Sequence, residues 1–437
     1  MKESNPHVSL NTNLSIDFLR VVTSFAEQAA IAFGLDKTES LKLTLASEEV
    51  FAYLCRVAAT GEAITIEASN GGYFAQIEFL FRASDFNPRN LNLTSTVSLD
   101  DASSLDEMGL LIASRSVERF YIANEPSQGL GLTLVKEKSY PDSGNLPIPQ
   151  PKPLDKPSVR TPEPDGLKVL VRMLPAHYPS HLYPADFRFP GKVVDMVAGG
   201  EYGARVVANE LGQIGGGIIW RWAGSKTAEV FGPYLFNQIP GSGLAELLLD
   251  ACIGHFAKTE AVDVISRYST PETPRGYFEP LGATSFTGPD GTVKPWPVYY
   301  RQLREDPGCQ VWAHPDLESF LKAEYQRIAF TREIQLTNYE GERRKPYSVF
   351  APEFDRSHRQ VFLRPIWDGT DAPGNLAQHI KVLKAENIPN IFFEIDLAHA
   401  WQASLTPALL GQGFRPRLVL PYGGEGDVVV FQYQEGK

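Results

Sequence analysis

The chain has 437 residues, of which 43% are hydrophobic and 21% are charged, and its formal net charge is −11 at pH 7. Such a length exceeds one ordinary hydrophobic core, so we expect roughly two or three domains. The negative charge argues against a nucleic-acid partner, because a phosphate-binding surface needs clustered lysine and arginine residues. There is no apolar run of about 18 residues and no signal-peptide-like N-terminus, which predicts a cytoplasmic protein without a membrane partner.

The first predicted domain, residues 1–138, opens with two amphipathic helices. Apolar residues recur at helical spacing up to Phe33, and Gly34 then suits the end of the first helix. The second helix is predicted over 39–58, with an apolar stripe on one face and Glu49 and Tyr53 together on another.

Strands and a third helix complete this domain. Two strands are expected over 63–68 and 73–81, because Ser-Asn-Gly-Gly between them is a strong hairpin signal. A helix is expected over 108–120 and a strand over 131–136. The order predicts an α/β sandwich.

The element order resembles the histidine-kinase-type ATPase fold, and among its members the anti-sigma-factor serine kinases. The segment 45–56 is similar to the N-box helix of this family, and 107–112, Glu-Met-Gly-Leu-Leu-Ile, is similar to its second glycine box. The resemblance implies nucleotide-binding roles for Glu49 and Gly109. An unrelated α/β sandwich is the alternative.

The domain departs from this family where the metal should bind. In the family, a glutamate on the N-box helix activates the reaction and an asparagine four residues later holds Mg²⁺. Glu49 matches the glutamate, but Tyr53 stands at the asparagine position, and a register based on Glu48 places Ala52 there. Since Mg²⁺ needs hard oxygen ligands to bridge phosphates, we expect Mg-ATP chemistry to be lost.

The adenine-binding residues of the family are also replaced. Phe81 and Ala83 stand where the resemblance implies an aspartate and a glycine, although Asp85 permits another alignment.

A proline-rich segment, residues 139–166, follows the first domain. It contains eight prolines in 28 residues, which favours an extended, semi-rigid tether rather than a helix. The alternative is a ligand for an aromatic groove on another protein. The tether separates residues 1–138 from residues 167–437, and we expect these parts to move relative to one another.

The domain predicted over 167–310 contains a glycine loop between a strand and a helix. Strands are expected over 205–208, 214–222, 230–236 and 262–268, and a helix over 244–258. The loop is Gln238, Ile239, Pro240, Gly241, Ser242 and Gly243. Because Gly241 and Gly243 have no side chain, a phosphate can approach the backbone and the N–H groups of the first helical turn. A tight turn without a ligand is the alternative.

The spacing Q-x-x-G-x-G resembles the pyrophosphate loop of the GNAT N-acetyltransferases, which holds acetyl-CoA at such a junction. The resemblance implies acetyl-CoA as the cofactor and residues 238–243 as its binding site. The segment 276–283 is similar to the helix and the leucine-glycine corner that close a GNAT core.

The catalytic residues are predicted from the needs of acetyl transfer, which uses a base and often an acid. Glu229, just before the strand that leads to the loop, is the expected base, and Asp263 or Arg267 could face the same cleft. The resemblance places a tyrosine acid at Phe278, so the adjacent Tyr277 is the candidate acid. For each of the charged candidates the alternative is an ordinary surface charge.

The last predicted domain, residues 311–437, resembles a second GNAT-like half domain. Helices are expected over 317–328, 376–386 and 403–410, and strands over 361–366, 390–397, 417–421 and 427–432. Residues 410–414, Leu-Gly-Gln-Gly-Phe, repeat the closing corner, but no glycine loop precedes the helix at 376. This half either completes the first sheet or pairs with it as a pseudo-dimer.

The expected fold class is α/β (α+β), with an ATPase-like sandwich followed by a GNAT-like mixed sheet and a GNAT-like half domain. The expected function is that of a bacterial signalling protein that combines a degenerate kinase-like domain with an acetyl-CoA-binding acetyltransferase. Its expected partners are a sigma factor or an anti-sigma antagonist and a small-molecule or protein amine. The alternative is a non-catalytic regulator in which both modules only bind partners.

Overall fold

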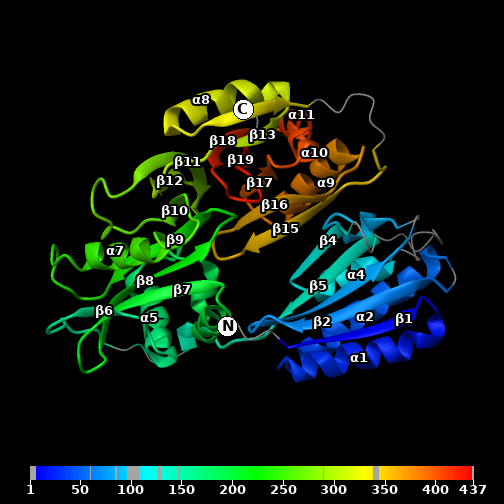
Figure 1. The fold of residues 1–437 in the computed structure, drawn as a ribbon, viewed down its shortest axis with the longest axis horizontal. Helices are drawn as coiled ribbons and strands as arrows, with labels where there is room; N and C mark the ends of the chain where they lie inside the picture. The colour runs from blue at the N-terminus through cyan, green and yellow to red at the C-terminus, as the bar shows by residue number, and fades with distance from the viewer. Residues whose placement is uncertain are drawn as a thin grey trace. The chain divides into compact units, whose positions relative to one another are not determined.

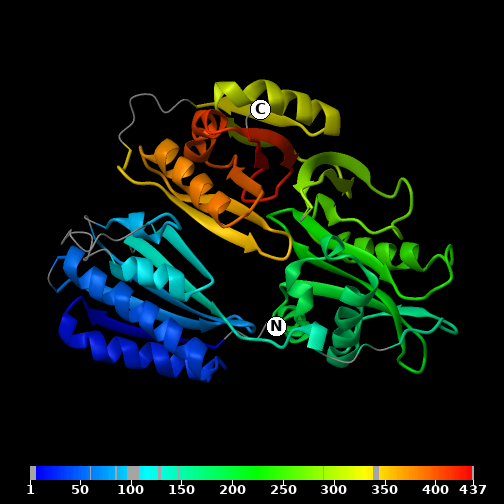
Figure 2. The ribbon, with the colours of Figure 1, turned by 180° about the vertical axis from the view of Figure 1, so that it is seen from behind.

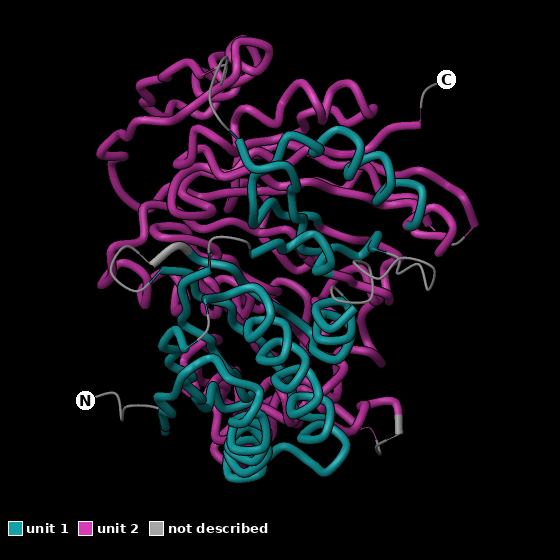
Figure 3. The backbone as a smooth tube through the Cα atoms, turned by 90° about the vertical axis from the view of Figure 1, so that its right-hand side faces the viewer, with its two compact units in different colours: residues 1–139, 343–353, 363–382 teal, residues 140–342, 354–362, 383–437 magenta. Residues whose placement is uncertain are grey.

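The structure is a computed structural model that describes residues 6–59, 61–83, 86–95, 108–125, 129–145, 148, 150–288, 290–337 and 344–435. Its chain forms two compact units (Figure 3). Unit 1 comprises residues 1–139, 343–353 and 363–382, and unit 2 comprises residues 140–342, 354–362 and 383–437. Two residues named in the ATPase resemblance, Asp85 and Glu107, lie outside the described residues.

Unit 1 is built on a five-stranded sheet in the order β1-β2-β3-β5-β4, and all the neighbouring pairs are antiparallel. Its strands are β1 (His7–Asn13), β2 (Ala63–Asn70), β3 (Phe74–Phe81), β4 (Arg119–Glu125) and β5 (Gly129–Glu137). Alternate residues of β2 and β3 are buried, so one face of the sheet lies against helices. The helices, visible in Figures 1 and 2, are α1 (Leu19–Ala32), α2 (Lys37–Val57) and α4 (Met108–Ser116).

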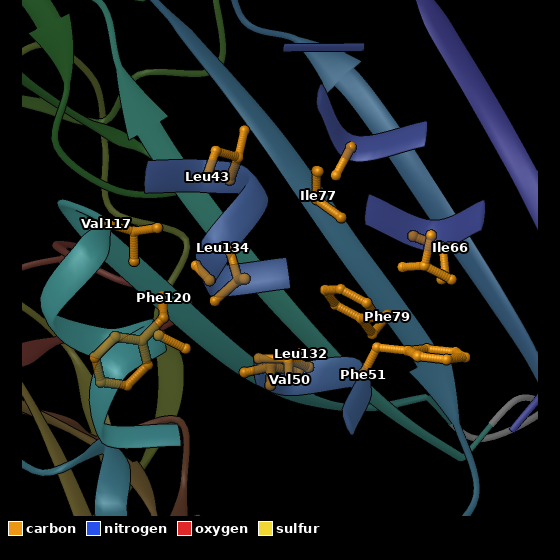
Figure 4. Close-up of a cluster of buried hydrophobic side chains, with 14 of the residues drawn as sticks. Leu43, Val50, Phe51, Ile66, Ile77, Phe79, Val117, Phe120, Leu132 and Leu134 are labelled. Carbon is orange, nitrogen blue, oxygen red and sulfur yellow. The ribbon is translucent and has the colours of Figure 1, made fainter. Parts of the chain in front are cut away.

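The core of unit 1 lies between α2 and the sheet. Figure 4 shows Val50 and Phe51 of α2 beside Phe79 and Leu132 of the sheet, and all four side chains are buried. Helix α2 begins with a capping box, in which the side chains of Asp36 and Glu39 each bond the backbone N–H of the other.

The sequence-based prediction for unit 1 omits β1 and also misplaces the end of one helix. The helix predicted over 108–120 is wrong beyond Ser116, because the chain turns and enters β4 at Arg119. Phe120 is buried in the core from this strand, which pairs with β5. The apolar residues near 120 therefore follow the two-residue period of a strand rather than continuing the helix.

Unit 2 contains a seven-stranded sheet in the order β11-β12-β10-β9-β8-β7-β6. Its strands are β6 (Ser158–Arg160), β7 (Tyr202–Ala208), β8 (Ile214–Trp222), β9 (Thr227–Leu235), β10 (Asp263–Tyr268), β11 (Glu279–Thr287) and β12 (Val293–Gln302). The parallel pair β9 and β10 is connected through α7 (Leu244–Phe256). Nearly all residues of β8 and β9 are buried, as expected when helices cover both faces of a sheet. Two further helices, α5 (Pro164–His177) and α6 (Pro190–Ala198), pack against β7.

Two predictions for unit 2 are wrong in their local structure. The segment 139–166 is not a free tether, because its residues 158–160 form β6, which pairs with β7, and its last residues belong to α5, which begins at Pro164. Proline is compatible with the first turn of a helix, where its missing N–H would have no partner. The helix expected at 276–283 is also absent: strand β11 begins at Glu279 instead.

From residue 360 onward the remaining chain follows the predicted order of elements, but the three strands before that point were not predicted. It contains the parallel pair β13 (Cys309–Ala313) and β14 (Arg332–Leu336) and a sheet in the order β15-β16-β17-β19-β18. The sheet strands are β15 (Val349–Asp355), β16 (Gln360–Trp367), β17 (Asn390–Asp396), β18 (Phe414–Leu420) and β19 (Val428–Tyr433), and the helices are α8 (Pro315–Ile328), α9 (Ala372–Ala385), α10 (Ala400–Ala403) and α11 (Thr406–Gly411). The helix predicted over 403–410 is thus two short helices.

Candidate functional site

The glycine loop of unit 2 lies between the end of β9 and the start of α7. Gly241 and Gly243 have φ of 74° and 76°, in the left-handed region that favours glycine. A Cβ placed on either residue would have no atom of the described chain within 4 Å. Gly243 caps α7 without a side-chain hydrogen bond. The loop is therefore open beside the N-terminal N–H groups of a helix, an arrangement that favours an anion.

Gln238 holds another part of the chain against this loop. Its side-chain oxygen accepts the N–H of Leu154 at 3.1 Å, and its Nε2 donates to the carbonyl of Lys152 at 3.1 Å and to that of Phe236 at 2.7 Å. The neighbouring Asn237 donates to the carbonyl of Pro151 at 3.2 Å. The side chain of Gln238 thus anchors the proline-rich segment, which its position in the motif did not indicate.

The other loop residues are largely exposed. Ile239 has 70% of its surface exposed, and Pro240 and Ser242 are also exposed. The N–H of Ser242 bonds the carbonyl of Ile239, which closes the turn. The exposed part of the predicted phosphate loop is therefore residues 239–243.

Glu229 is fully buried in β9 between two arginines. Arg221 donates to its Oε2 at 2.9 and 3.0 Å, and Arg267 donates to Oε1 at 2.6 Å and to Oε2 at 3.0 Å. Burial alone would raise the pKa of Glu229, but Arg267 and Arg221 lower it to about 2. A carboxylate held at this pKa is ionised and is a weak base near neutral pH.

Asp263 lies at the start of β10, opposite Thr227 of β9. Both of its carboxylate oxygens are buried, and neither has a hydrogen-bond partner within the described chain. The hydroxyl of Thr227 instead donates to the carbonyl of Pro421. Burial raises the pKa of Asp263 to about 8. This candidate is therefore a neutral acid at neutral pH.

Tyr277 lies in the turn segment that precedes β11. Its hydroxyl donates to Asp250 of α7 at 2.9 Å, and the guanidinium of Arg301 lies 4.2 Å from the centre of its ring. Burial and the Asp250 carboxylate raise the pKa of Tyr277 well above its ordinary value. The two candidate catalytic residues share none of these partners: Tyr277 contacts Asp250 and Arg301, whereas Glu229 contacts Arg221 and Arg267. The adjacent Phe278 is buried against the core around α7.

In unit 1, two residues of the ATPase resemblance lie side by side. A Cβ added to Gly109 of α4 would lie 2.8 Å from Oε2 of Glu49 on α2. Glu49 is partly exposed, and burial together with the nearby Glu48 raises its pKa above the ordinary value. The absence of a side chain at Gly109 therefore makes room for the Glu49 carboxylate.

Tyr53, at the position of the family's metal ligand, is buried and bonded to the main chain. Its hydroxyl accepts the N–H of Asn87 at 2.9 Å and donates to the carbonyl of the same residue at 3.2 Å. Its ring meets Phe86 edge-on at 6.0 Å between centroids, and Phe86 in turn meets Phe81 at 5.2 Å and Trp367 at 6.3 Å. An aromatic cluster thus surrounds this position, and the phenol oxygen is already bonded.

Unit 1 also includes contacts that the sequence did not indicate. The side-chain amide of Asn92 donates to the carbonyl of Ser348 at 2.8 Å and accepts the N–H of Phe350 at 3.1 Å. Asn375 of α9 donates to the Ser348 carbonyl at 3.0 Å and to Asn92 at 3.2 Å. Ser348, Phe350 and Asn375 are each more than 250 positions from Asn92 along the chain, so no local pattern connects Asn92 with them.

Within the described ranges, no group of three or more His, Cys, Asp or Glu residues is arranged to hold a metal ion. None of the helices there combines the length and hydrophobicity that crossing a bilayer would require.

Comparison with known proteins finds no matching family model and no similar curated protein. The RsbU and RsbW domains of a Mycobacterium tuberculosis protein are 16% identical, with a TM-score of 0.23, over 31% of this chain and 33% of that chain. A putative acetyltransferase from Acinetobacter baylyi ADP1 is 16% identical, with a TM-score of 0.28, over 33% of this chain and 92% of that chain. A GNAT family N-acetyltransferase from Escherichia coli, solved with CoA, is 14% identical, with a TM-score of 0.24, over 36% of this chain and 86% of that chain.

The similar structures thus include RsbU and RsbW domains as well as acetyltransferases, among them members of the GNAT family. The fold class is mixed α/β. The chain spans about a third of the structure that contains the RsbU and RsbW domains.

Proposed function

We propose that this protein is a bacterial signalling regulator that binds acetyl-CoA at the loop 239–243 of unit 2. The observation that carries the proposal is the open pair Gly241 and Gly243 at the start of α7. Two left-handed glycines with free space around them permit a diphosphate to approach the backbone, and the helix N-terminus supplies N–H donors and positive potential. The supporting resemblance is the Q-x-x-G-x-G spacing of residues 238–243, which lie between β9 and α7.

In this proposal Glu229 has a structural role within the sheet rather than the role of a base. A carboxylate held between Arg221 and Arg267 orients both guanidinium groups and fixes the end of β10 against β9. Tyr277 is proposed as the acid candidate because its hydroxyl carries a proton, which Asp250 holds in the free protein.

A second candidate function is a regulator that binds acetyl-CoA without transferring the acetyl group. The low pKa of Glu229 and the engagement of Tyr277 with Asp250 favour it, because neither group is then available as a base or a free acid. For the transferase, the acceptor is an amine on a small molecule or a protein.

We also propose that unit 1 acts through protein contacts and has no ATP chemistry. The partner class that the resemblance suggests is a sigma factor or an anti-sigma antagonist. The residue at the metal-ligand position, Tyr53, does not fit Mg²⁺, because its hydroxyl is bonded to Asn87 inside an aromatic cluster.

The test is calorimetric titration of the full chain with acetyl-CoA. Gly241→Val should weaken binding by about tenfold or more, since its side chain occupies the space that the phosphates need and removes N–H contacts. The control is Gly291→Val, in the hairpin between β11 and β12. Gly291 has φ of 78° and equally open surroundings, so a valine at this position introduces the same backbone strain away from the loop. Equal affinity of the wild type and Gly241→Val would refute the site.

A further inference from the structure

The outer edge of β9 lies next to the candidate phosphate loop. The N–H of Phe236, just beyond β9, bonds Gly215 of the β8 side, so the preceding residue Leu235 directs its own N–H and carbonyl away from β8. Pro233 is two residues earlier, and its carbonyl points to the same edge. The neighbouring strand β10 pairs with β9 only as far as Tyr268, opposite Phe231. Beyond that point, no strand among the described residues pairs with β9 on this side.

Two side-chain hydroxyls satisfy this edge instead of a strand. Thr270 donates to the carbonyl of Pro233 at 2.6 Å. Tyr178, just after α5, accepts the N–H of Leu235 at 2.7 Å and donates to the carbonyl of the same residue at 3.0 Å. The single phenol oxygen of Tyr178 therefore hydrogen-bonds both the N–H and the carbonyl of Leu235.

The ring of Tyr178 is held firmly in this position. It is 7% exposed and lies edge-on to Tyr234 at 5.1 Å and to Phe236 at 6.1 Å between ring centroids. Because Tyr178 is buried at the end of α5, its hydroxyl can leave Leu235 only if this segment moves or the side chain changes rotamer.

We propose that Tyr178 determines which part of a CoA-type ligand this site can bind. The proposal rests on the proposed function, in which the phosphates bind at 239–243. A ligand held there by its diphosphate can extend an amide-bearing arm along β9 only by bonding the main chain of Leu235, as an added strand would. Since Tyr178 occupies those groups, the wild-type protein recognises the phosphorylated nucleotide and gives the pantetheine arm no hydrogen bonds at this edge.

The experiment compares two probes on the full chain: CoA, and 3′-phosphoadenosine 5′-diphosphate, which has the same phosphates but no arm. For the wild type, we expect the two dissociation constants to agree within about threefold. Tyr178→Phe keeps the ring but frees Leu235, and should strengthen CoA binding over the armless probe by about five- to tenfold, the value of one or two new hydrogen bonds. Tyr183→Phe is the matched control, because Tyr183 is also buried but its hydroxyl has no hydrogen bond to β9.

Hydrogen exchange at the Leu235 amide gives a second measurement. In Tyr178→Phe this amide should exchange faster than in the wild type, and CoA should restore its protection whereas the armless probe should not. A wild type that binds CoA far more tightly than the armless probe would overturn the role of Tyr178, and so would an unchanged ratio in Tyr178→Phe. If neither probe binds the wild type or Tyr178→Phe, the phosphate site itself is wrong, and the role of Tyr178 is refuted with it.

Discussion

The side-chain amide of Gln432 pairs with both main-chain polar groups of Ser285. Its Oε1 accepts the N–H of Ser285 at 2.8 Å, and its Nε2 donates to the carbonyl. Two residues further along β11, Asn390 makes the same pair of bonds with Thr287, at 2.8 and 3.1 Å. Side chains of β17 and β19 thus satisfy the outer edge of β11. A strand edge whose N–H and carbonyl groups are already hydrogen-bonded cannot readily pair with a further strand.

This arrangement predicts that the seven-stranded sheet and the strands β17 and β19 depend on each other. Gln432→Ala should lower the free energy of unfolding by about 1–3 kcal/mol, because Ser285 is left with an unpaired N–H and carbonyl. Urea denaturation of the full chain measures the change. Gln434→Ala, at an exposed glutamine nearby, should have little effect. Equal stability of the two variants would contradict the proposal that residues 311–437 and the first acetyltransferase-like core form one structure.

The buried carboxyl of Asp263 predicts an unusual pH dependence of stability. Its pKa is about 8 in the folded protein, against an ordinary value of 3.8. Between about pH 4 and pH 8 the unfolded chain releases this proton while the folded protein keeps it, so this group lowers stability progressively as the pH rises through that range. Asp263→Asn should therefore raise the melting temperature at pH 7.5 and have a much smaller effect at pH 4. The control is Asp290→Asn, at a surface position, and a gain independent of pH would show that Asp263 does not titrate as expected.

Glu229 predicts the opposite dependence, because its folded pKa of about 2 is below the ordinary 4.5. Its stabilising contribution should be complete above about pH 4.5 and should disappear as the pH falls toward 2. Glu229→Gln leaves Arg221 and Arg267 without a shared counter-charge and should cost about 3–5 kcal/mol at pH 7. Thermal melts of both proteins from pH 2 to pH 7 should converge at the acid end. Curves that stay parallel would indicate that the lost packing, rather than the charge, causes the effect.

Unit 1 is predicted to have no Mg-dependent ATP hydrolysis or phosphoryl transfer. The reason is that Tyr53 takes the position of a metal ligand and its hydroxyl bonds Asn87, so the charge on the phosphates is not neutralised. The measurement is phosphate release by the full chain with and without Mg²⁺. Turnover that requires Mg²⁺ and is lost in Glu49→Ala would contradict the prediction.

Local patterns along the sequence were enough to predict most of the helices and strands. The apolar stripe of α7, the hairpin between β2 and β3 and the order of elements from β16 onward follow from periodicity and turn residues, which depend on near neighbours. The open glycines at 241 and 243 could also be predicted, since their backbone conformation is a local property.

The partners of the polar side chains were decided by the tertiary structure. Periodicity shows that a face is buried, but not which distant residues cover it. Glu229 was therefore a plausible base until Arg221 and Arg267 were found on either side of it, and Gln238 a plausible ligand contact until its bonds to residues 152 and 154 were seen. Tyr178 is 57 residues from Leu235, so only the packing of α5 against the sheet places its hydroxyl on the edge of β9.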